Sequence, residues 1–518
     1  MRGPVRNRDA FWAGLSTDRG LPAARTQTLS AINSRMTPRP LSPFQLARLM
    51  VCLPFFIMLG LMVMEAVLNA TTTYLVIQTG RDVAAGNFII ADLMWILAVQ
   101  SASYVVGAVS WIFAERAGFL AYGRYMLRFA RDNRQRPQLL GDKDAREQVE
   151  PFLTGETFEV YFHLIYEIEG DLRILLALVL NVIVLGTQID GSLPVAYALV
   201  IATLFLMQWL MRKRIAAAYL ENQRKNNRMT AQGYTAWDNV FAGNRYNLRL
   251  WIDGFKARLR DGLYAQLVAI MTKEGLSAAS GIVSLAIVFA AMAWTAFRHS
   301  GDMTVLIALA ATLPRQIEMT HDVHSFTSGW NDLLAQWTRL RGVADNIHPP
   351  VDPDFDERTK YDLLTLREEG HASHVASLDD AMALILAKPT GRINVRGPNG
   401  AGKSTLLVSL KSAVKSCAYY WPTADRLSFQ FTRGKDEVEV DEDGDPLPPC
   451  EGRRAGFSSG ERQLQALREI VGRTHAPIYL LDEWDANLDP RNRAAADALV
   501  DELARRARVV EISHRDRT

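Results

Sequence analysis

Apolar residues form long runs over the first 315 residues of the chain and only short runs after them. A helix needs about 20 predominantly apolar residues to cross the hydrocarbon core of a bilayer. The runs predict six membrane spans, at residues 49–75, 88–113, 172–189, 193–211, 276–297 and from 303 onward. We therefore expect a six-helix transmembrane domain at 49–345, followed by a soluble domain at 350–518.

Lysine and arginine in the connecting segments predict the orientation of the spans, because basic loops stay in the cytoplasm. Residues 1–48 carry eight arginines, and residues 211–274 carry twelve basic residues against five acidic ones. The N-terminal arm and elbow at 1–48 and the C-terminal third are therefore expected in the cytoplasm. The connections at 114–171 and 212–275 show charged residues at helical spacing, so we expect long helical extensions rather than independent soluble insertions.

Carboxylates also occur within the apolar runs. A charge at the centre of a span costs about 2.5–3.5 kcal/mol on insertion scales, so Glu65 and Asp92 are expected to face the interior of a bundle. Glu65 is either a group on a substrate pathway or a neutralised carboxylate, whereas Asp92, near the start of its span, is expected to be neutralised or interfacial.

The sixth span is purely apolar only at 305–313, so its polar continuation either lines a cavity or another subunit, or is a cytoplasmic helix.

The composition narrows the class of protein. The chain has 518 residues, of which 49% are hydrophobic, and this content excludes a disordered or fibrous protein. Its 58 basic and 56 acidic residues leave a net charge of +2, which gives no electrostatic reason to expect a nucleic-acid partner. The three cysteines are too few and too scattered for a disulfide framework or a zinc site, and the histidines show no ligand spacing.

The strongest motif of the soluble part is GPNGAGKST, which follows a strand-like alternation at 392–396 and precedes a helix-like stretch at 404–414. In that setting the backbone wraps closely, its N–H groups point inward and the helix N-terminus adds positive potential, so we expect a bound triphosphate. Lys403 would contact the β- and γ-phosphates, and Ser404 would ligate Mg²⁺. The predicted nucleotide-binding residues are Gly397, Pro398, Asn399, Gly400, Ala401, Gly402, Lys403, Ser404 and Thr405.

A second motif is the apolar run at 478–481, which ends in the two carboxylates Asp482 and Glu483. A run of this kind predicts a buried parallel strand. Asp482 is expected to hold Mg²⁺ through water, and Glu483 is expected to act as the general base on the attacking water. Either carboxylate alone could cap a helix, but beside a phosphate loop the pair predicts nucleotide hydrolysis.

Between these two motifs the chain resembles the ATP-binding cassette (ABC) family. The segment 457–468 is similar to the family's signature motif, and the segments 486–489 and 511–514 are similar to its D-loop and its switch segment. The motifs stand in the family's order and spacing, and six spans ahead of them resemble the exporter-type arrangement. The matched residues are Ser458, Ser459, Gly460 and Glu461 of the signature, Asp489 of the D-loop and the switch histidine His514.

The resemblance implies a half-transporter, in which one membrane domain is fused to one P-loop α/β nucleotide-binding domain. Two chains, expected as a homodimer, would enclose two ATP molecules with Mg²⁺, each between the phosphate loop of one chain and the signature of the other. Ser458 and Gly460 would therefore act in trans, and His514 would be catalytic beside Glu483. ATP use would export a peptide-like, lipid or other amphipathic substrate across a bacterial inner (plasma) membrane by alternating access.

The sequence departs from the family pattern in three places. Only about 53 residues separate the serine of the phosphate loop from that of the signature, so the helical subdomain is expected to be shortened. The glutamine that precedes this subdomain in the family has no clear counterpart: Thr423 stands at the expected position, and Gln430 is the alternative. The aromatic residue that stacks on adenine is unassigned, with His374 near the expected distance and Tyr361 further upstream.

A reading from another class is a membrane-anchored regulator whose shortened cassette binds ATP without driving transport. The missing glutamine and the reduced subdomain favour it. A soluble DNA-repair cassette protein with the same type of signature is excluded by the apolar spans.

Overall fold

The computed structural model describes residues 41–87, 89–422, 427–432, 458–486 and 488–513. The structure is mostly helical, at 78%, so the small mixed sheet is a minor part of it. The chain divides into two compact units, and their described residues are 41–127 with 152–345 for one and 128–151 with 346–513 for the other.

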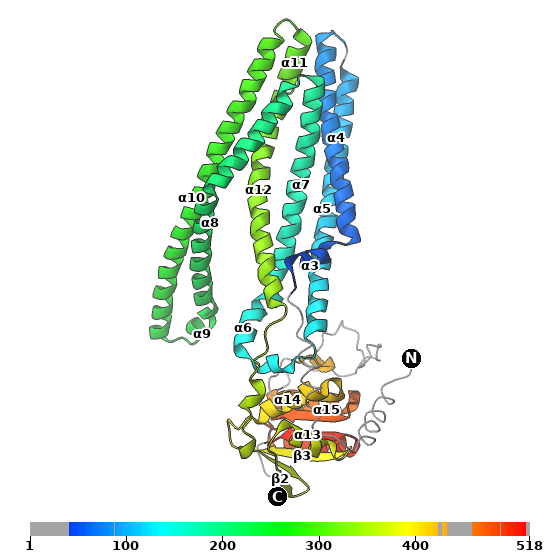
Figure 1. The fold of residues 1–518 in the computed structure, drawn as a ribbon, viewed down its shortest axis with the longest axis vertical. Coiled ribbons are helices and arrows are strands. Elements are labelled where there is room, and N and C mark those ends of the chain that lie inside the picture. Colours follow the sequence, from blue (N-terminus) through cyan, green and yellow to red (C-terminus); the bar gives the residue numbers. More distant parts are fainter. Residues whose placement is uncertain (1–40, 88, 423–426, 433–457, 487, 514–518) are drawn as a thin grey trace, which may run out of the picture. The chain divides into compact units, whose positions relative to one another are not determined.

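Long helices build the first unit. A short helix, α3 (Pro43–Ala47), is closed at its start by a capping box between Ser42 and Gln45. The long helices are α4 (Leu53–Ala84), α5 (Ile90–Asn133), α7 (Thr157–Gln188), α8 (Ser192–Tyr234), α10 (Arg245–Arg298) and α12 (Leu313–Asn346), and the short helix α11 (Met303–Ala311) lies between the last two. Helices α8 and α10 lie side by side and are joined through α9 (Ala236–Phe241), as Figure 1 shows. Residues 212–275, predicted as a helical extension, lie mainly in α8, α9 and α10.

Within the described residues, four helices are long and apolar enough to cross a membrane, namely α4, α5, α8 and α10. They contain the predicted first and second spans from Leu53 and Ile90 onward, and the whole of the predicted fourth and fifth spans. The predicted third span lies in α7, where charged residues up to Arg173 directly precede the apolar half. The predicted sixth span begins in α11, which has only nine residues, and passes into the polar helix α12. The count of six spans is thus not supported beyond these four helices.

Buried charges lie inside the helical unit. Glu65 of α4 is only 9% exposed, as expected, and its Oε1 accepts a hydrogen bond from Arg173 Nη1 of α7 at 3.1 Å. Arg173 also pairs with Glu169, so the arginine compensates two carboxylates. Gly107 of α5 makes room for the Glu65 carboxylate, because a Cβ there would lie 2.8 Å from Glu65 Oε1. Asp92 lies in the first turn of α5 and is half-buried.

His324 of α12 is held by serines of α10. Its Nε2 lies 2.6 Å from Ser277 Oγ, and its Nδ1 lies 3.1 Å from Ser280 Oγ. Both ring nitrogens therefore have hydrogen-bond partners. Across the part of the chain that the structure describes, no group of three or more His, Cys, Asp or Glu residues could hold a metal ion.

The second unit contains a six-stranded sheet with the order β2-β1-β3-β6-β5-β4. Strand β1 is antiparallel to β2 and β3, and the pairs β3–β6, β6–β5 and β5–β4 are parallel. The strands are β1 (Thr365–Glu368), β2 (His371–His374), β3 (Gly391–Arg396), β4 (Ala418–Trp421), β5 (Ile478–Asp482) and β6 (Arg508–Ile512). The buried parallel strand predicted at 478–481 is therefore confirmed as β5, which is buried along its whole length.

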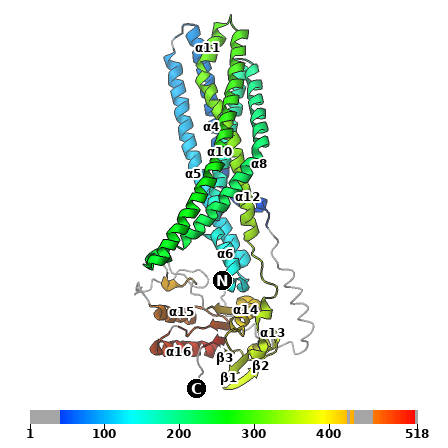
Figure 2. The same cartoon turned by 90° about the vertical axis from the view of Figure 1, so that its left-hand side faces the viewer.

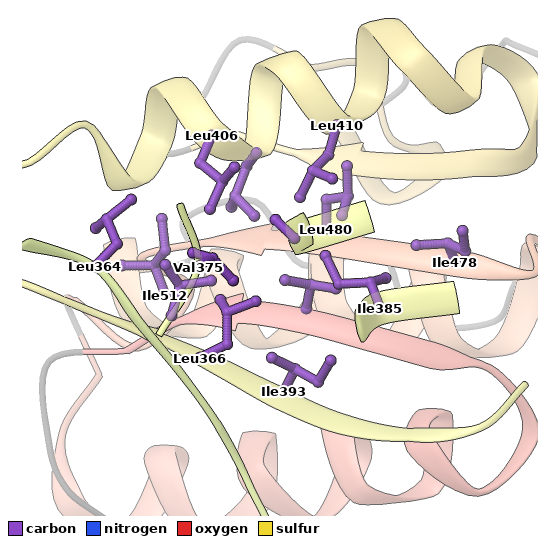
Figure 3. Packing of buried hydrophobic residues seen from close by; sticks show 14 of the residues in the cluster. Leu364, Leu366, Val375, Ile385, Ile393, Leu406, Leu410, Ile478, Leu480 and Ile512 are labelled. Atoms are coloured by element: carbon purple, nitrogen blue, oxygen red, sulfur yellow. The ribbon is translucent and has the colours of Figure 1, made fainter. Parts of the chain in front are cut away.

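Helices cover both faces of this sheet (Figures 2 and 3). Helices α13 (Leu378–Leu386) and α14 (Lys403–Val414) lie on one face, and α15 (Ser459–Arg473) and α16 (Pro490–Arg506) lie on the other. Side chains of a strand alternate between faces, so Leu480 of β5 packs toward α14, whereas Tyr479 and Leu481 pack toward α15 and α16. Figure 3 shows Leu406 and Leu410, one helical turn apart on α14, pointing at the strands. Each such buried leucine contributes about 1.5–3 kcal/mol.

The segment that follows α5 belongs to the second unit rather than to the long helices. It forms a 3-10 turn, η2 (Pro137–Gly141), and then α6 (Lys143–Pro151), whereas the π-helical turn (Phe152–Glu156) and α7 that follow belong to the first unit. Gln138 Nε2 of η2 donates to Ser412 Oγ of α14 at 2.6 Å. Asn133 Nδ2 donates to Ile347 O at 2.9 Å, just ahead of the sheet. The connection that follows α5 is thus anchored on α14, the helix that follows the glycine-rich loop.

Candidate nucleotide site

The loop between β3 and α14 places two glycines in the left-handed region of backbone conformation. Gly400 has φ +81° and Gly402 has φ +87°. Glycine adopts these angles without a steric penalty. Space is limiting as well, because a Cβ at Gly402 would lie 2.8 Å from Thr359 Cα and a Cβ at Gly397 would lie 2.8 Å from Leu363 O. The glycines of the motif are therefore required by the close wrap of the loop and by the segment packed on it.

The positive end of α14 points into this loop. The helix starts at Lys403 with Gly402 as its N-cap, so its first N–H groups have no partner within the helix. Lys403 Nζ folds back over the loop and donates to Gly397 O at 2.9 Å and to Pro398 O at 3.2 Å. Backbone N–H groups, the helix dipole and an ammonium group thus converge on one place. This combination suits a phosphate group.

Ser404 and Asp482 lie side by side at the edge of the sheet. Ser404 Oγ, in the first turn of α14, donates to Asp482 Oδ1 at the end of β5 at 3.0 Å. Asp482 is 5% exposed. A hydroxyl and a carboxylate oxygen are the hard ligands that Mg²⁺ prefers, and Mg²⁺ commonly takes its remaining ligands from water and substrate phosphates. The two residues predicted to hold Mg²⁺ therefore fit that ion.

Tyr420 of β4 joins this pair and was not predicted from the sequence. Its hydroxyl donates to Asp482 Oδ2 at 3.4 Å. Burial, and then the neighbouring Asp482 carboxylate, raise the pKa of the Tyr420 phenol, so the hydroxyl stays a donor at neutral pH. Tyr420 pairs with Leu480 in the sheet, one strand away from the carboxylates. The sequence contains an aromatic run at 419–421, but this run does not show which residue of β5 lies opposite Tyr420.

Glu483 follows directly after β5 and has φ +50°, a left-handed conformation that non-glycine residues rarely adopt. Its N–H donates to Ile512 O of β6 at 3.1 Å. Strained residues of this kind gather at functional sites, where the surrounding structure holds them. The side chain is half-buried. The predicted general base is thus placed at the same sheet edge as Asp482 and the phosphate loop.

The signature residues form the start of α15. Ser458 is the N-cap: its Oγ accepts from Glu461 N at 3.3 Å, while Glu461 Oε2 accepts from Ser458 N at 2.9 Å. This reciprocal capping box explains why Glu461 can stand at this position. Ser458 and Ser459 are exposed and Gly460 is buried. The N-terminus of α15 therefore presents two exposed serines.

Of the other predicted motif residues, the structure describes Asp489 and Gln430 but not His514 and Thr423. Asp489 caps α16, since its Oδ1 accepts from Arg491 N and Asn492 N, both at 2.9 Å. His514 and Thr423 lie outside the described residues. Gln430 lies in a 3-10 turn, where its N–H donates to Glu469 Oε1 of α15 at 2.7 Å.

The two candidates for the adenine contact lie close to the start of the phosphate loop in the fold. His374 of β2 pairs with Thr365 of β1, which in turn pairs with Arg396, the last residue of β3. Tyr361 follows Lys360, whose N–H donates to Ala401 O of the loop at 3.0 Å. Tyr361 is half-buried against the sheet core. The structure therefore brings the more distant candidate, Tyr361, to the loop as well.

Comparison with known protein families and with curated proteins returns no match. The functional interpretation rests on the motifs and on the geometry above.

Proposed function

We propose that this chain is an ATP-driven transporter of the ABC type, a half-transporter that acts as a homodimer and exports a peptide-like, lipid or other amphipathic substrate. The observation that supports it most is the contact between Ser404 and Asp482 at 3.0 Å, which joins the phosphate loop to the carboxylate strand. The same chain carries four helices of membrane-spanning length and apolarity. An ATP site in such a chain favours transport over soluble ATPase functions.

The residues of the site would divide the chemistry among them. Lys403 and the N-terminus of α14 bind the phosphates, and Ser404 and Asp482 hold Mg²⁺. When bound, Mg²⁺ neutralises charge on the β- and γ-phosphates. Glu483 orients the attacking water and accepts its proton, which is general-base catalysis. Ser458 and Gly460 of a second copy complete the site in trans.

A route from ATP to the membrane helices is supported within the second unit. Gln138 of η2 bonds to Ser412 of α14, so η2 contacts the helix that begins at the phosphate loop. In the chain, η2 follows α5 after three residues. Movement of α14 on ATP binding would therefore act on the end of a membrane-spanning helix. We propose that this contact takes part in coupling.

The pairing with a second copy is supported by exposed aromatic side chains at the tip formed by α8, α9 and α10. Trp237 is 71% exposed, Phe241 is 70% exposed and Tyr246 is 75% exposed. Large exposed apolar groups of this kind mark interaction surfaces. They belong to the segment with twelve basic residues, which we propose to lie in the cytoplasm. There they would contact the partner chain rather than lipid.

The second candidate, a membrane-anchored ATP-binding regulator, is favoured by one observation. Only about 53 residues separate Ser404 of the phosphate loop from Ser458, a shorter spacing than the family pattern. A cassette without an extended helical subdomain would bind ATP but transmit little of its movement. Transport assays separate the two functions.

The decisive experiment compares wild-type protein with Glu483→Gln and Lys403→Ala in sealed vesicles. Glu483→Gln should lower the rate of ATP hydrolysis by about 10²-fold or more while ATP still binds, because it removes the base and keeps the phosphate contacts. Lys403→Ala should weaken ATP binding itself. Transport of labelled peptides and lipids should require ATP and should stop in the Glu483→Gln protein.

Two results would contradict the proposal. Full hydrolysis by the Glu483→Gln protein would remove Glu483 from its role. ATP binding and hydrolysis without movement of any labelled compound, in vesicles where transport by a reference protein is intact, would favour the regulator.

A further inference from the structure

Trp484, the residue after Glu483, is fixed at three points. It is 3% exposed, and its indole Nε1 donates to Glu511 Oε2 of β6 at 2.8 Å. Its backbone carbonyl accepts from Gln463 Nε2 of α15 at 2.8 Å. Its ring lies under the Arg392 guanidinium, whose carbon is 5.7 Å from the ring centroid. None of these contacts involves the phosphate loop, so the phosphate chemistry does not account for them.

The acceptor Glu511 is itself rigidly held. It is 2% exposed, and a buried carboxylate is costly unless it is paired and hydrogen-bonded. Arg392 of β3 donates to both of its oxygens, from Nε at 2.7 Å and from Nη2 at 2.8 Å. The same guanidinium donates to Asp497 and Asp501 of α16, both at 2.8 Å. A bidentate pair in this setting gives Glu511 a single orientation.

These contacts bear on Glu483 through the backbone. Glu483 has φ +50° and its N–H is bonded to Ile512 O, so it is tied to β6 on its N-terminal side. Trp484 ties the next residue to Glu511, one position earlier on the same strand. The backbone is therefore bonded to β6 both at Glu483 and, through the side chain of Trp484, at the next residue. These two bonds fix the backbone conformation of Glu483 and with it the direction of the bond from Cα to Cβ. A general base must be held in that way, because misplacement by about 1 Å can cost about 10²-fold in rate.

We infer that Trp484 is a positioning residue for Glu483: its bond to Glu511, supported by Arg392, and its bond to Gln463 fix the direction of the hydrolytic carboxylate. This inference rests on the proposed hydrolysis of ATP. It gives a role to Arg392 of β3, and to Gln463 and Glu511, which lie within the segments 457–468 and 511–514 but are not among the predicted site residues. A purely structural role would lower stability without changing the catalytic step selectively.

The test is Trp484→Phe in the full-length protein in vesicles, since phenylalanine keeps an aromatic ring but is smaller and lacks the indole N–H. We expect kcat for ATP hydrolysis to fall by about tenfold to a hundredfold, with ATP affinity unchanged within about twofold. The matched control is Tyr479→Phe. Tyr479 lies on β5, the strand that leads to Glu483, and in the same apolar cluster as Trp484, and its hydroxyl bonds to Thr474 Oγ1 at 3.0 Å at the end of β5 away from Glu483. The control should keep its kcat within about twofold.

A second variant, Gln463→Leu, removes the other bond to Trp484 without touching the buried charges, and it should lower kcat in the same direction. If Trp484→Phe does not fold, the kcat of Gln463→Leu tests the inference instead. A wild-type kcat in either folded variant, or an equal fall in Tyr479→Phe, overturns the inference. If either result is found while Glu483→Gln is inactive, the positioning role of Trp484 is refuted but the proposed ATP hydrolysis is still supported. Wild-type protein without hydrolysis would overturn both.

Discussion

Residues in left-handed backbone conformation surround the candidate site. Gly400 and Gly402 lie in the loop, and Glu483 lies at the end of β5. The glycines follow from the motif, because a loop that wraps a phosphate needs positive φ angles. The conformation of Glu483 does not follow from its sequence, since a glutamate shows no preference for it. It arises from the bonds to β6, which are long-range contacts.

The first prediction concerns Gly402. Replacement by alanine should reduce stability by about 1–3 kcal/mol and lower ATP affinity, because the residue has φ +87° and a Cβ would lie 2.8 Å from Thr359 Cα. Gly472→Ala is the matched control. Gly472 lies inside α15 with no atom within 4 Å of a Cβ, so alanine there should stabilise the helix by up to about 1 kcal/mol. Thermal unfolding and ATP titration measure both effects, and equal behaviour of the two variants would contradict the prediction.

A second residue-scale feature is Arg508 of β6, which is fully buried. It donates to both carboxylate oxygens of Glu368 in β1, at 2.5 Å and 3.1 Å. The hydrogen bonds from Arg508 hold the pKa of Glu368 below its usual range, against the opposing effect of burial, and Lys388 adds to them. A lowered pKa means that the charged form is favoured in the folded protein.

The pH dependence follows with a definite sign. The stabilisation from Glu368 is fully present above the unfolded-state pKa of about 4.3 and is lost as the pH falls through the lower folded-state pKa. Glu368→Gln should lower the unfolding temperature at neutral pH and flatten its decline in acid. The neighbouring Glu369→Gln, at a side chain 80% exposed, should leave both nearly unchanged. An unaltered acid profile for Glu368→Gln would contradict the assignment.

At the scale of elements, the continuous apolar run at 478–481 predicted β5 but not its neighbours in the sheet. Leu480 and Tyr479 face opposite helix layers, which a continuous apolar run conceals. The placement of η2 against α14 was not foreseen either. Helical spacing of charges after the second span indicated only an extension, whereas α5 ends at Asn133 and the segment that follows belongs to the second unit, where η2 contacts α14.

The η2 contact gives a prediction about coupling. Gln138→Ala should keep ATP hydrolysis within about twofold but lower the substrate moved per ATP by about fivefold, the effect of losing one neutral hydrogen bond of about 1 kcal/mol. Ser412→Ala removes the same bond from α14 and should match it. The double variant should be no worse than either single one, because both changes break one interaction. Additive losses, or undiminished transport, would show that this bond does not couple.

At the scale of the whole molecule, the number of spans decides the topology. With six spans, the tip at Ala242 lies in the cytoplasm and the turn at Ser300 lies outside. With only α4, α5, α8 and α10 spanning, both positions change sides. The twelve basic residues at 211–274 favour the six-span arrangement, because basic segments stay in the cytoplasm.

Labelling of single cysteines tests this arrangement. Ala242→Cys and Ser300→Cys, both at exposed positions, are introduced into a chain whose three native cysteines are replaced by serine. In intact cells a membrane-impermeant thiol reagent should label Ser300→Cys, and it should label Ala242→Cys only after permeabilisation. The reverse pattern would establish the four-span topology and refute the proposed count.

The sequence by itself determined the features that depend on neighbouring residues: the glycine loop ahead of α14, the buried strand β5 and the apolar helices. Local backbone preference and burial act over a few positions, so the pattern suffices. The tertiary structure alone decided which distant groups meet. Ser404 and Asp482 are 78 positions apart, and Arg392 and Glu511 are 119 apart. Their contact depends on the order and register of parallel strands, which are set by packing of the whole sheet rather than by any single segment.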